Sequence, residues 1–435
     1  MTDDPRPERA LERCARFVRE AEEGAGEDLC EALRPHPAEE RPAPRRMPAG
    51  TDHSCEGLAR RRAHLCDHGI RIEALTGAAP DPPPEELAGS IEYHVGWARV
   101  PVGVIGPLRV NGGAARGDFF VPLATTEGTL VASLQMVANV VGRVGGVSAL
   151  CSDSVVGRVP CFGFADLARA ARFVAWLAPR AAALQETVAR TSRHCRLADL
   201  RARAVGNEVH VWLDFETGDA AGQNMVTLAA DAICRRLLEE MPDAPRYWRV
   251  EASGSADKKA SVQALLGARG RRVDAEVTLP AELVRRIWRL APAEVVRTWS
   301  SVAVGALSAG ALGLHANYGN AVAALFLACG QDVACVAEAA LGISRFELAD
   351  DGGLYVSATL PNLIVGTVGG GTHLPTAREC LAMMDCAGSG RSRKLAEICG
   401  AVALLGEVAC ITALSGGGFA QAHATGGRRP VDPAS

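Results

Sequence analysis

The order of strands and helices between residues 158 and 250 constrains the fold of this chain more than any other feature. A short strand at 159–163 precedes a long helical stretch, two strands follow on either side of Gly206-Asn207, and a second helix leads to a last strand, YWRVEA. A Gly-Asn break between two strands is typical of a β-hairpin. The β-α-β-β-α-β order predicts a ferredoxin-like unit over residues 158–250.

The remaining segments predict an α+β fold in which this unit is inserted into a larger domain. Residues 51–157 and 251–412 mix strand-like stretches, Gly/Pro turns and apolar helices, so we expect them to form one large domain of helices and strands. Residues 1–50 are rich in Pro, Glu and Arg, and we expect a mobile leader with one helix at 7–23. Residues 413–435 are expected to form a flexible C-terminal flap.

Charge and cysteine content exclude several classes of protein. The formal net charge is -4 and no basic run contains interleaved aromatic residues, which argues against a nucleic-acid-binding surface. The apolar stretch at 321–330 is too short to cross a bilayer, and the N-terminus lacks the apolar core of a signal peptide. The 14 cysteines are scattered, with no Cys/His cluster at zinc spacing. We therefore expect a cytoplasmic protein that binds no membrane, nucleic acid or metal.

Residues 366–372, GTVGGGT, are a candidate anion-binding loop. The chain has no GxGxxG motif after a strand and no Walker A loop, so a conventional nucleotide fingerprint is absent. Three consecutive glycines nevertheless expose backbone N–H groups and allow a bulky anion to approach closely. A flexible loop without a ligand is the alternative interpretation.

Four ionisable side chains each have a structural and a catalytic interpretation. Glu127, in ATTEG, lies where a strand turns into a helix, and it either belongs to the helix cap or is an acid in an apolar pocket. Lys258, in ADKKA, fits a solvated lysine, and Asp332, in ACGQD, fits a helix cap. His423 lies in a Gly/Ala-rich tail, where a lone histidine is normally incidental. None of the four decides the function by itself.

Six segments, taken together and in order, resemble the motifs of the 3-hydroxy-3-methylglutaryl-CoA (HMG-CoA) reductase family. They are PVGVIGPL, PLATTEGTLVAS, GDAAGQNM, DKKA, ACGQD and GTVGGGT, and the resemblance covers roughly residues 90–425. It is closer to the eukaryotic-type class (class I), without the membrane anchor of the animal enzymes. It implies reduction of (S)-HMG-CoA to mevalonate and CoA, with two NADPH per turnover. It also implies active sites formed between the subunits of a dimer or tetramer.

The resemblance assigns roles to the residues that match the motifs. The catalytic set would be Glu127, Lys258, Asp332 and His423. The substrate-binding residues would be Arg158, Ser253, Asp257, Lys259 and Asn320. The cofactor-binding residues would be Ser192, Arg193, Asp219, Gly222, Asn224, Met225, Gly369, Gly370, Gly371 and Thr372, which makes residues 158–250 the NADP-binding domain. Ser192-Arg193 falls where the eukaryotic-type enzymes hold the 2′-phosphate, which favours NADPH because a guanidinium pairs bidentately with phosphate.

These residue types suit the two-step reduction of a thioester. The Lys258 ammonium would stabilise the oxyanion that hydride addition creates. His423, as imidazolium, would protonate the departing CoA thiolate, and a protonated Glu127 would supply the proton of the alcohol. We expect Asp332 to bridge the lysine and the glutamate, so that the three groups titrate as one coupled unit.

The sequence departs from the family pattern near the acid end of the substrate. Ser301 stands where a lysine usually helps to bind the carboxylate, and the loop at 253–257 is shorter than usual. Ala260 replaces a usual proline, and Ala422 replaces the serine before the catalytic histidine. Two alternatives therefore stay open: a diverged reductase of a different acyl-CoA, and a non-catalytic paralogue that binds acyl-CoA or regulates a partner. Retention of all four catalytic positions argues against the paralogue.

Overall fold

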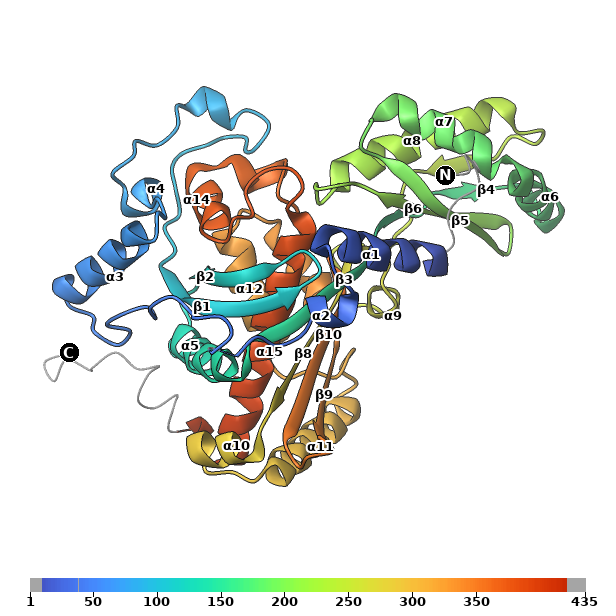
Figure 1. Ribbon diagram of the computed structural model, residues 1–435. Coiled ribbons are helices and arrows are strands. Elements are labelled where there is room, and N and C mark those ends of the chain that lie inside the picture. Colours follow the sequence, from blue (N-terminus) through green and yellow to red (C-terminus); the bar gives the residue numbers. More distant parts are fainter. Residues whose placement is uncertain (1–9, 38, 421–435) are drawn as a thin grey trace, which may run out of the picture.

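One mixed sheet runs through the molecule and connects its two parts (Figure 1). The computed structural model describes residues 10–37 and 39–420, and ten strands of this part of the chain join the sheet. Its main path has the order β7-β4-β6-β3-β8-β10-β9, with β1 and β2 attached at β3 and β5 attached at β6. The strands are β1 (Val102–Gly112), β2 (Arg116–Ala124), β3 (Val147–Arg158), β4 (Cys161–Gly163), β5 (Arg196–Val205), β6 (Glu208–Glu216), β7 (Tyr247–Arg249), β8 (Arg269–Leu279), β9 (Ile343–Leu348) and β10 (Leu354–Leu363).

Strand β3 belongs to both parts of the molecule. Its first residues pair with β1 in parallel, most of its length pairs with β8, and its end pairs with β6. The chain therefore passes from the large body into the smaller unit without leaving the sheet.

The smaller unit has the predicted ferredoxin-like arrangement. Its strands pair antiparallel in the order β7-β4-β6-β5, and Gly206, with φ +62°, forms the predicted hairpin turn between β5 and β6. The expected first helix is divided into α6 (Leu167–Leu177) and α7 (Ala181–Thr191), because Pro179 lies in the intervening 3₁₀ turn, Ala178–Arg180. The second helix is α8 (Gln223–Glu240). The α+β class is confirmed.

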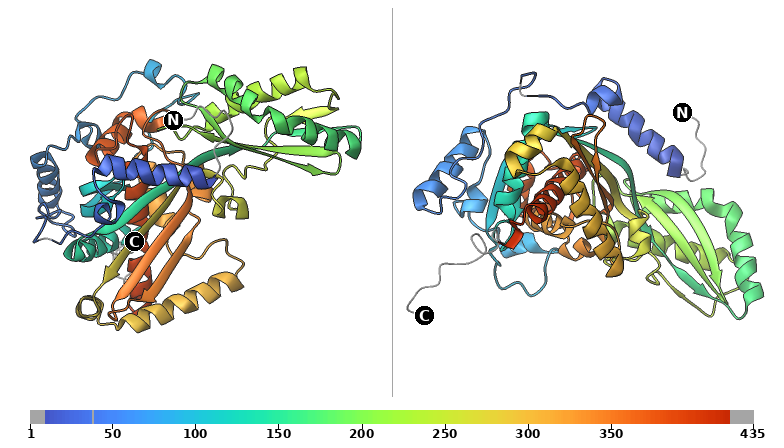
Figure 2. Two further views of the ribbon diagram at one scale, coloured as in Figure 1. Left: turned by 45° about the vertical axis from the view of Figure 1, so that its right-hand side comes forward. Right: turned by 90° about the horizontal axis from the view of Figure 1, so that it is seen from below.

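The large body is built around α15 (Ser392–Ser415), which packs on β3, β8 and β10. Figure 2 shows this helix enclosed by the sheet and by other helices. Within the residues described, α15 is the one helix long and apolar enough to cross a membrane, but 78% of its most apolar window is buried inside the molecule. Its apolar character is therefore that of a core helix.

Shorter helices surround this core. They are α2 (Leu29–Ala32), α3 (Cys55–Asp67), α4 (Glu73–Thr76), α5 (Leu130–Val141), α9 (Val262–Leu265), α10 (Ala281–Trp288), α11 (Pro292–Ser308), α12 (Tyr318–Ala328), α13 (Val336–Ala339) and α14 (Pro375–Met383). Single 3₁₀ turns lie at Pro84–Leu87, Gly142–Val144, Val333–Cys335 and Gly370–His373.

The N-terminal region differs from the expected mobile leader. Helix α1 (Ala10–Ala25) packs across β3, and its buried residues Arg13, Phe17 and Ala21 are spaced four apart on one face. Arg13 donates to Asp153 of β3 at 3.0 Å, and the guanidinium of Arg393 lies 3.9 Å from the centre of the Phe17 ring. The expected helix is therefore present as α1, and its packing against the sheet is what the composition did not indicate.

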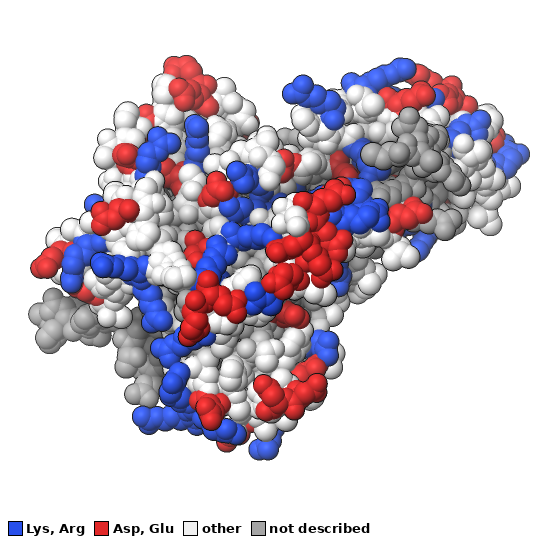
Figure 3. All heavy atoms as spheres, in the orientation of Figure 1, with Lys and Arg blue, Asp and Glu red and all other residues white. Residues whose placement is uncertain are grey.

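The surface charge is mixed in sign. On the face shown in Figure 3, acidic groups gather over α1 and α2, with basic side chains directly beside them. This distribution agrees with the absence of a basic nucleic-acid-binding run in the sequence. The predicted flap at 413–435 is described only to residue 420, so His423 lies outside the described residues.

Candidate active site

The two glycine-rich segments, far apart in the sequence, lie against each other. The backbone of Ala220, in GDAAGQNM, forms a bridge with Val368, in GTVGGGT, and the Thr367 amide donates to the Asp219 carbonyl at 2.9 Å. A Cβ at Gly366 would lie 2.5 Å from the Ala221 nitrogen, so this approach requires glycine.

The ACGQD segment closes the same junction from the other side. Gly330 has φ +63°, and a Cβ there would lie 2.3 Å from the carbonyl oxygen of Gly371. Asp332, two residues later, caps the 3₁₀ turn by accepting a hydrogen bond from the Ala334 amide at 3.1 Å. The capping interpretation of Asp332 therefore holds for one of its oxygens, while the other is free to face a partner.

That partner is Lys258. Its Nζ lies 2.8 Å from Asp332 Oδ2, and both side chains are 41% exposed. The hydrogen bond that Lys258 donates to Asp332 raises the pKa of Lys258, so the ammonium stays charged. Lys258 has φ +56°, a sparsely populated conformation for a side-chain-bearing residue, and its amide donates to the buried Glu338 at 3.2 Å. The backbone is thus held so that the ammonium points at Asp332.

Glu127 forms a second, separate pair with Asn320. The Asn320 amide donates to both carboxylate oxygens, at 2.8 and 2.6 Å, and the Glu127 backbone amide donates to Thr125 Oγ1 at 3.0 Å. Across residues 10–37 and 39–420, no hydrogen bond or ion pair joins Glu127 to Lys258 or Asp332. The expected Asp332 bridge is therefore not present, and Asn320, expected to bind substrate, contacts the glutamate.

Arg158, expected to bind the acid end of the substrate, is already paired with other side chains of the protein. Its guanidinium is buried, donates to Asp257 at 2.8 Å and to Thr227 at 2.9 Å, and Asp257 also accepts from Arg269 at 2.7 Å. Despite burial, which alone would raise it, the two guanidinium partners lower the pKa of Asp257. Substrate contact through Arg158 would therefore have to compete with Asp257.

Three residues that the motif comparison did not assign connect these groups. Gln223 donates to Asp332 at 3.1 Å and accepts from Arg269 at 2.9 Å, which links the start of α8 to the Lys258–Asp332 pair. Arg269 also donates to the fully buried Glu338 at 3.0 Å. Gln223 stands inside the GDAAGQNM motif and could have been found there. Arg269 and Glu338 have no local signal, since their role depends on packing.

The remaining cofactor and substrate candidates lie around this centre. Asp219 caps the start of α15, accepting from the amides of Gly390 at 2.6 Å and Ser392 at 3.2 Å, and these contacts lower its pKa. Its carboxylate is therefore engaged with the protein, unlike that of a free cofactor ligand. Lys259 is exposed and donates to the Asp257 carbonyl at 3.1 Å. Ser253, with φ +61°, begins the short loop.

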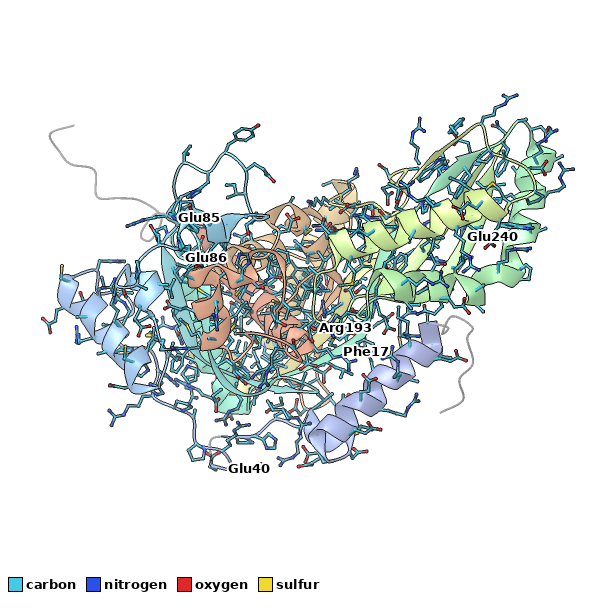
Figure 4. All side chains as sticks on the ribbon, turned by 90° about the horizontal axis from the view of Figure 1, so that it is seen from above. Phe17, Glu40, Glu85, Glu86, Arg193 and Glu240 are labelled. Atoms are coloured by element: carbon cyan, nitrogen blue, oxygen red, sulfur yellow. The ribbon has the colours of Figure 1, made fainter. Side chains whose placement is uncertain are left out.

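A cavity of about 370 Å³ adjoins the first glycine-rich segment. It lies between α1, the end of β6 and the start of α15, and Phe17, Gly218, Asp219, Arg271 and Arg393 line it. Arg193, two residues beyond the end of α7, lies near Phe17 in the view of Figure 4. Arg196, three residues further along, shares the carboxylate of Glu216 with Arg16 of α1. The predicted Ser192-Arg193 pair thus lies at the α1 side of the smaller unit.

Comparison with known proteins decides the family. A sequence profile described as Hydroxymethylglutaryl-coenzyme A reductase matches residues 58–428. The chain belongs to this family. It is 38% identical over 377 residues to the 3-hydroxy-3-methylglutaryl-coenzyme A reductase of Pyrococcus abyssi, covering 85% of this chain and 92% of the relative. The reductase of Aeropyrum pernix is 39% identical, covering 82% of this chain and 88% of the relative.

Solved structures of HMG-CoA reductase share the fold. The class II enzyme from Streptococcus pneumoniae, bound to NADPH in open conformations, superposes with a TM-score of 0.67 at 19% identity, covering 84% of this chain and 99% of that one. The expected assignment to the eukaryotic-type class is not supported. The relatives at 36–39% identity are archaeal, whereas reductase 1 of Dictyostelium discoideum is 32% identical and covered to 61%. As a member of the HMG-CoA reductase family, the chain is an oxidoreductase.

Proposed function

We propose that this HMG-CoA reductase converts (S)-HMG-CoA to mevalonate and CoA, with two NADPH per turnover. The observation that carries the proposal is the Lys258–Asp332 pair, which stands beside both glycine-rich segments. A fixed ammonium at this place can stabilise the oxyanion that forms when a hydride adds to a carbonyl. Asp332 keeps the ammonium charged and aimed, and Gln223 keeps Asp332 in place.

The residues at the junction fit a dinucleotide. Gly222 begins α8 with φ +80° and no side-chain cap, so the first amides of an 18-residue helix are free of a capping side chain. Gly369 and Gly370, with φ +72° and +55°, have open space where a Cβ would stand. Bound NADPH would supply hydride there. The residues that would hold it are Gly222, Asn224, Met225, Gly369, Gly370, Gly371 and Thr372, with Ser192 and Arg193 at the 2′-phosphate and Asp219 as the anchor of the loop.

Two further residues would supply the protons of the reaction. Glu127, oriented by Asn320, would protonate the alcohol oxygen, and His423 would protonate the CoA thiolate. The reaction itself needs no metal ion. We place the enzyme in the cytoplasm.

The acid end of the substrate would be held by Arg158, Ser253 and Lys259, and Asp257, also in the substrate-binding set, would orient the Arg158 guanidinium. Ser301 is neutral and adds no charge, and its hydroxyl donates to the Arg297 carbonyl within α11. This observation favours a second candidate, a reductase of an acyl-CoA other than HMG-CoA.

A second copy of the chain would complete the site. The segment 91–97 exposes large apolar side chains without a partner, with Ile91 51%, Tyr93 99% and Val95 101% exposed. It leads into β1 and then to the strand that ends before Glu127. We propose a dimer or tetramer in which this segment packs on a neighbouring subunit, which sedimentation velocity would test.

The decisive experiment is NADPH oxidation by the purified chain with HMG-CoA, with CoA and mevalonate measured as products. Product formation with HMG-CoA supports the proposal. Faster turnover of another acyl-CoA, such as one lacking the free carboxylate, would favour the second candidate. No oxidation with any acyl-CoA would contradict both.

A further inference from the structure

Among the described residues, helices pack on one face of the sheet of the smaller unit. Along β6, Val209, Val211 and Leu213 are buried on the side of α6, α7 and α8, whereas Glu208 and His210 alternate with them and point to the opposite side. Figure 1 shows α7 and α8 over one face of this sheet. The opposite face carries Glu208 and His210 and contacts α1 at Glu216, and it is called the open face.

Three side chains with metal-binding atoms meet on the open face. Cys161 and His210 are direct partners across β4 and β6, with Sγ 3.9 Å from Nε2. Glu208, two residues before His210, places Oε2 3.6 Å from the same nitrogen. All three ligand atoms lie within 4.8 Å of one another.

This spacing is close to that of a tetrahedral zinc centre. Bond lengths of about 2.3 Å to sulfur and about 2.0–2.1 Å to nitrogen and oxygen give S–N and N–O separations of roughly 3.3–3.6 Å. The observed 3.9 and 3.6 Å differ from these by a few tenths of an ångström, which small rotations of the side chains would remove. We propose that Cys161, Glu208 and His210 form a Zn²⁺ site on the open face, with water as the fourth ligand.

The neighbouring residue Gly163 supports the arrangement. It lies between Glu208 and Tyr247 in the cross-strand register, and a Cβ there would lie 2.2 Å from Tyr247 Cζ. The missing side chain allows the Tyr247 ring to cross β4 and donate its hydroxyl to Glu208. A hydrogen bond of this kind orients a ligating carboxylate.

The cations beside the site are held by aromatic rings. Arg249, the other cross-strand partner of Cys161, lies over the Tyr247 ring at 5.6 Å, and Arg203, the partner of His210, lies over Trp212 at 5.5 Å. One thiolate and one carboxylate would neutralise a divalent ion. Among common divalent ions, the sulfur and imidazole ligands favour Zn²⁺ over Mg²⁺ or Ca²⁺. The ion would tie β4 to β6 outside the catalytic set.

The test uses the full chain, freed of metal by chelation and desalting. Titration with Zn²⁺ alone should show one tight site per chain, and Co²⁺ alone should give a thiolate-to-cobalt charge-transfer band in the near ultraviolet. Cys161→Ser should abolish that band. Cys161→Ser and His210→Gln should each weaken Zn²⁺ binding at least about tenfold, because the loss of a residue that only hydrogen-bonds to a metal ligand already costs that much.

The matched control is the double variant Cys55→Ser/His53→Gln, which removes an exposed thiol and an exposed imidazole elsewhere. It should bind Zn²⁺ like the unmodified chain. If circular dichroism shows that Cys161→Ser does not fold, Zn²⁺ titration of Glu208→Gln tests the proposal instead. The Glu208 side chain is half-exposed, and glutamine keeps its shape. Unchanged Zn²⁺ affinity in the cluster variants, or no cobalt–thiolate band in the unmodified chain, would overturn the proposal.

Discussion

Asn320 donates its side-chain amide to both carboxylate oxygens of Glu127, from the first turn of α12. The start of α12 is itself fixed by a residue of α15. Glu407 of α15, 0% exposed, accepts hydrogen bonds from the amides of Ala316 and Asn317 at 2.9 and 2.6 Å. The orientation of the acid therefore depends on a chain of contacts that begins in the core helix.

Asn320→Ala should lower kcat by between about tenfold and a hundredfold, since the proton donor loses its fixed direction. The KM for HMG-CoA should change little, because the thioester does not depend on this contact for binding. Steady-state kinetics at saturating NADPH measure both constants. A rise in KM at unchanged kcat would instead assign Asn320 to substrate binding.

Gln223 offers a test of how Asp332 is positioned. Gln223→Glu would place a second carboxylate beside Asp332, about 3 Å away, and like charges at this distance raise the pKa of one of the two acids. We expect kcat to fall and its acid limb to move to higher pH, whereas Gln223→Ala should lower kcat without moving that limb. Identical pH profiles for the two variants would argue against a charge effect at Asp332.

Cofactor choice rests on Arg193. Arg193→Ala should weaken NADPH by about 1.5–3 kcal/mol, the value of a charge-assisted contact, and should leave NADH nearly unaffected. Arg190→Ala is the matched control, because Arg190 is also exposed in the last turn of α7. Dissociation constants for both nucleotides decide the point, and an equal loss for the two would show that Arg193 does not touch the 2′-phosphate.

Stability should depend on pH through Glu397. This side chain is buried in α15, accepts from the amides of Ala115 at 2.6 Å and Cys151 at 3.0 Å, and burial raises its pKa to about 7. Because the folded pKa exceeds that of the unfolded chain, the folded state holds the extra proton between about pH 4.3 and 7. The stabilising contribution is full below that window and is lost as pH rises through it, by up to about 4 kcal/mol.

Denaturant unfolding at pH 5 and pH 7.5 tests this prediction. Glu397→Gln cannot titrate, so the free energy of unfolding of the unmodified chain should fall relative to that of the variant as pH rises. Other titrating groups cancel in the comparison. Parallel pH curves for the two proteins would mean that Glu397 does not exchange a proton in this range.

Motifs in the sequence located the glycine-rich segments and the Lys258–Asp332 pair, because each motif carries its own backbone geometry. The ferredoxin-like order was also readable, since strand and helix periodicities are local. The Arg158–Asp257 pair was not predicted as such, although both residues were singled out. Which guanidinium meets which carboxylate depends on tertiary packing.

Dependence on tertiary packing also explains why the sequence did not indicate the Arg269–Glu338 pair or the Cys161 cluster. Glu338 stands in a short apolar helix and meets Arg269 only in the folded protein. Cys161 is 47 residues from Glu208 along the chain, and strand pairing brings them together. Only the Glu-x-His spacing on one strand face was visible, and it is too common to predict a metal site.

The two proton donors act at different stages of the reaction, so variants can separate them. His423→Gln should block turnover of HMG-CoA but leave reduction of free mevaldehyde largely intact, because the aldehyde has no thiolate to protonate. Glu127→Gln should impair both reactions, since the alcohol oxygen still needs its proton and an amide is a poor acid. Lys258→Ala should abolish both by removing the oxyanion partner. Rates with the two substrates are compared for each variant at saturating NADPH. Equal loss of both activities in His423→Gln would show that this histidine does not act on the thiolate.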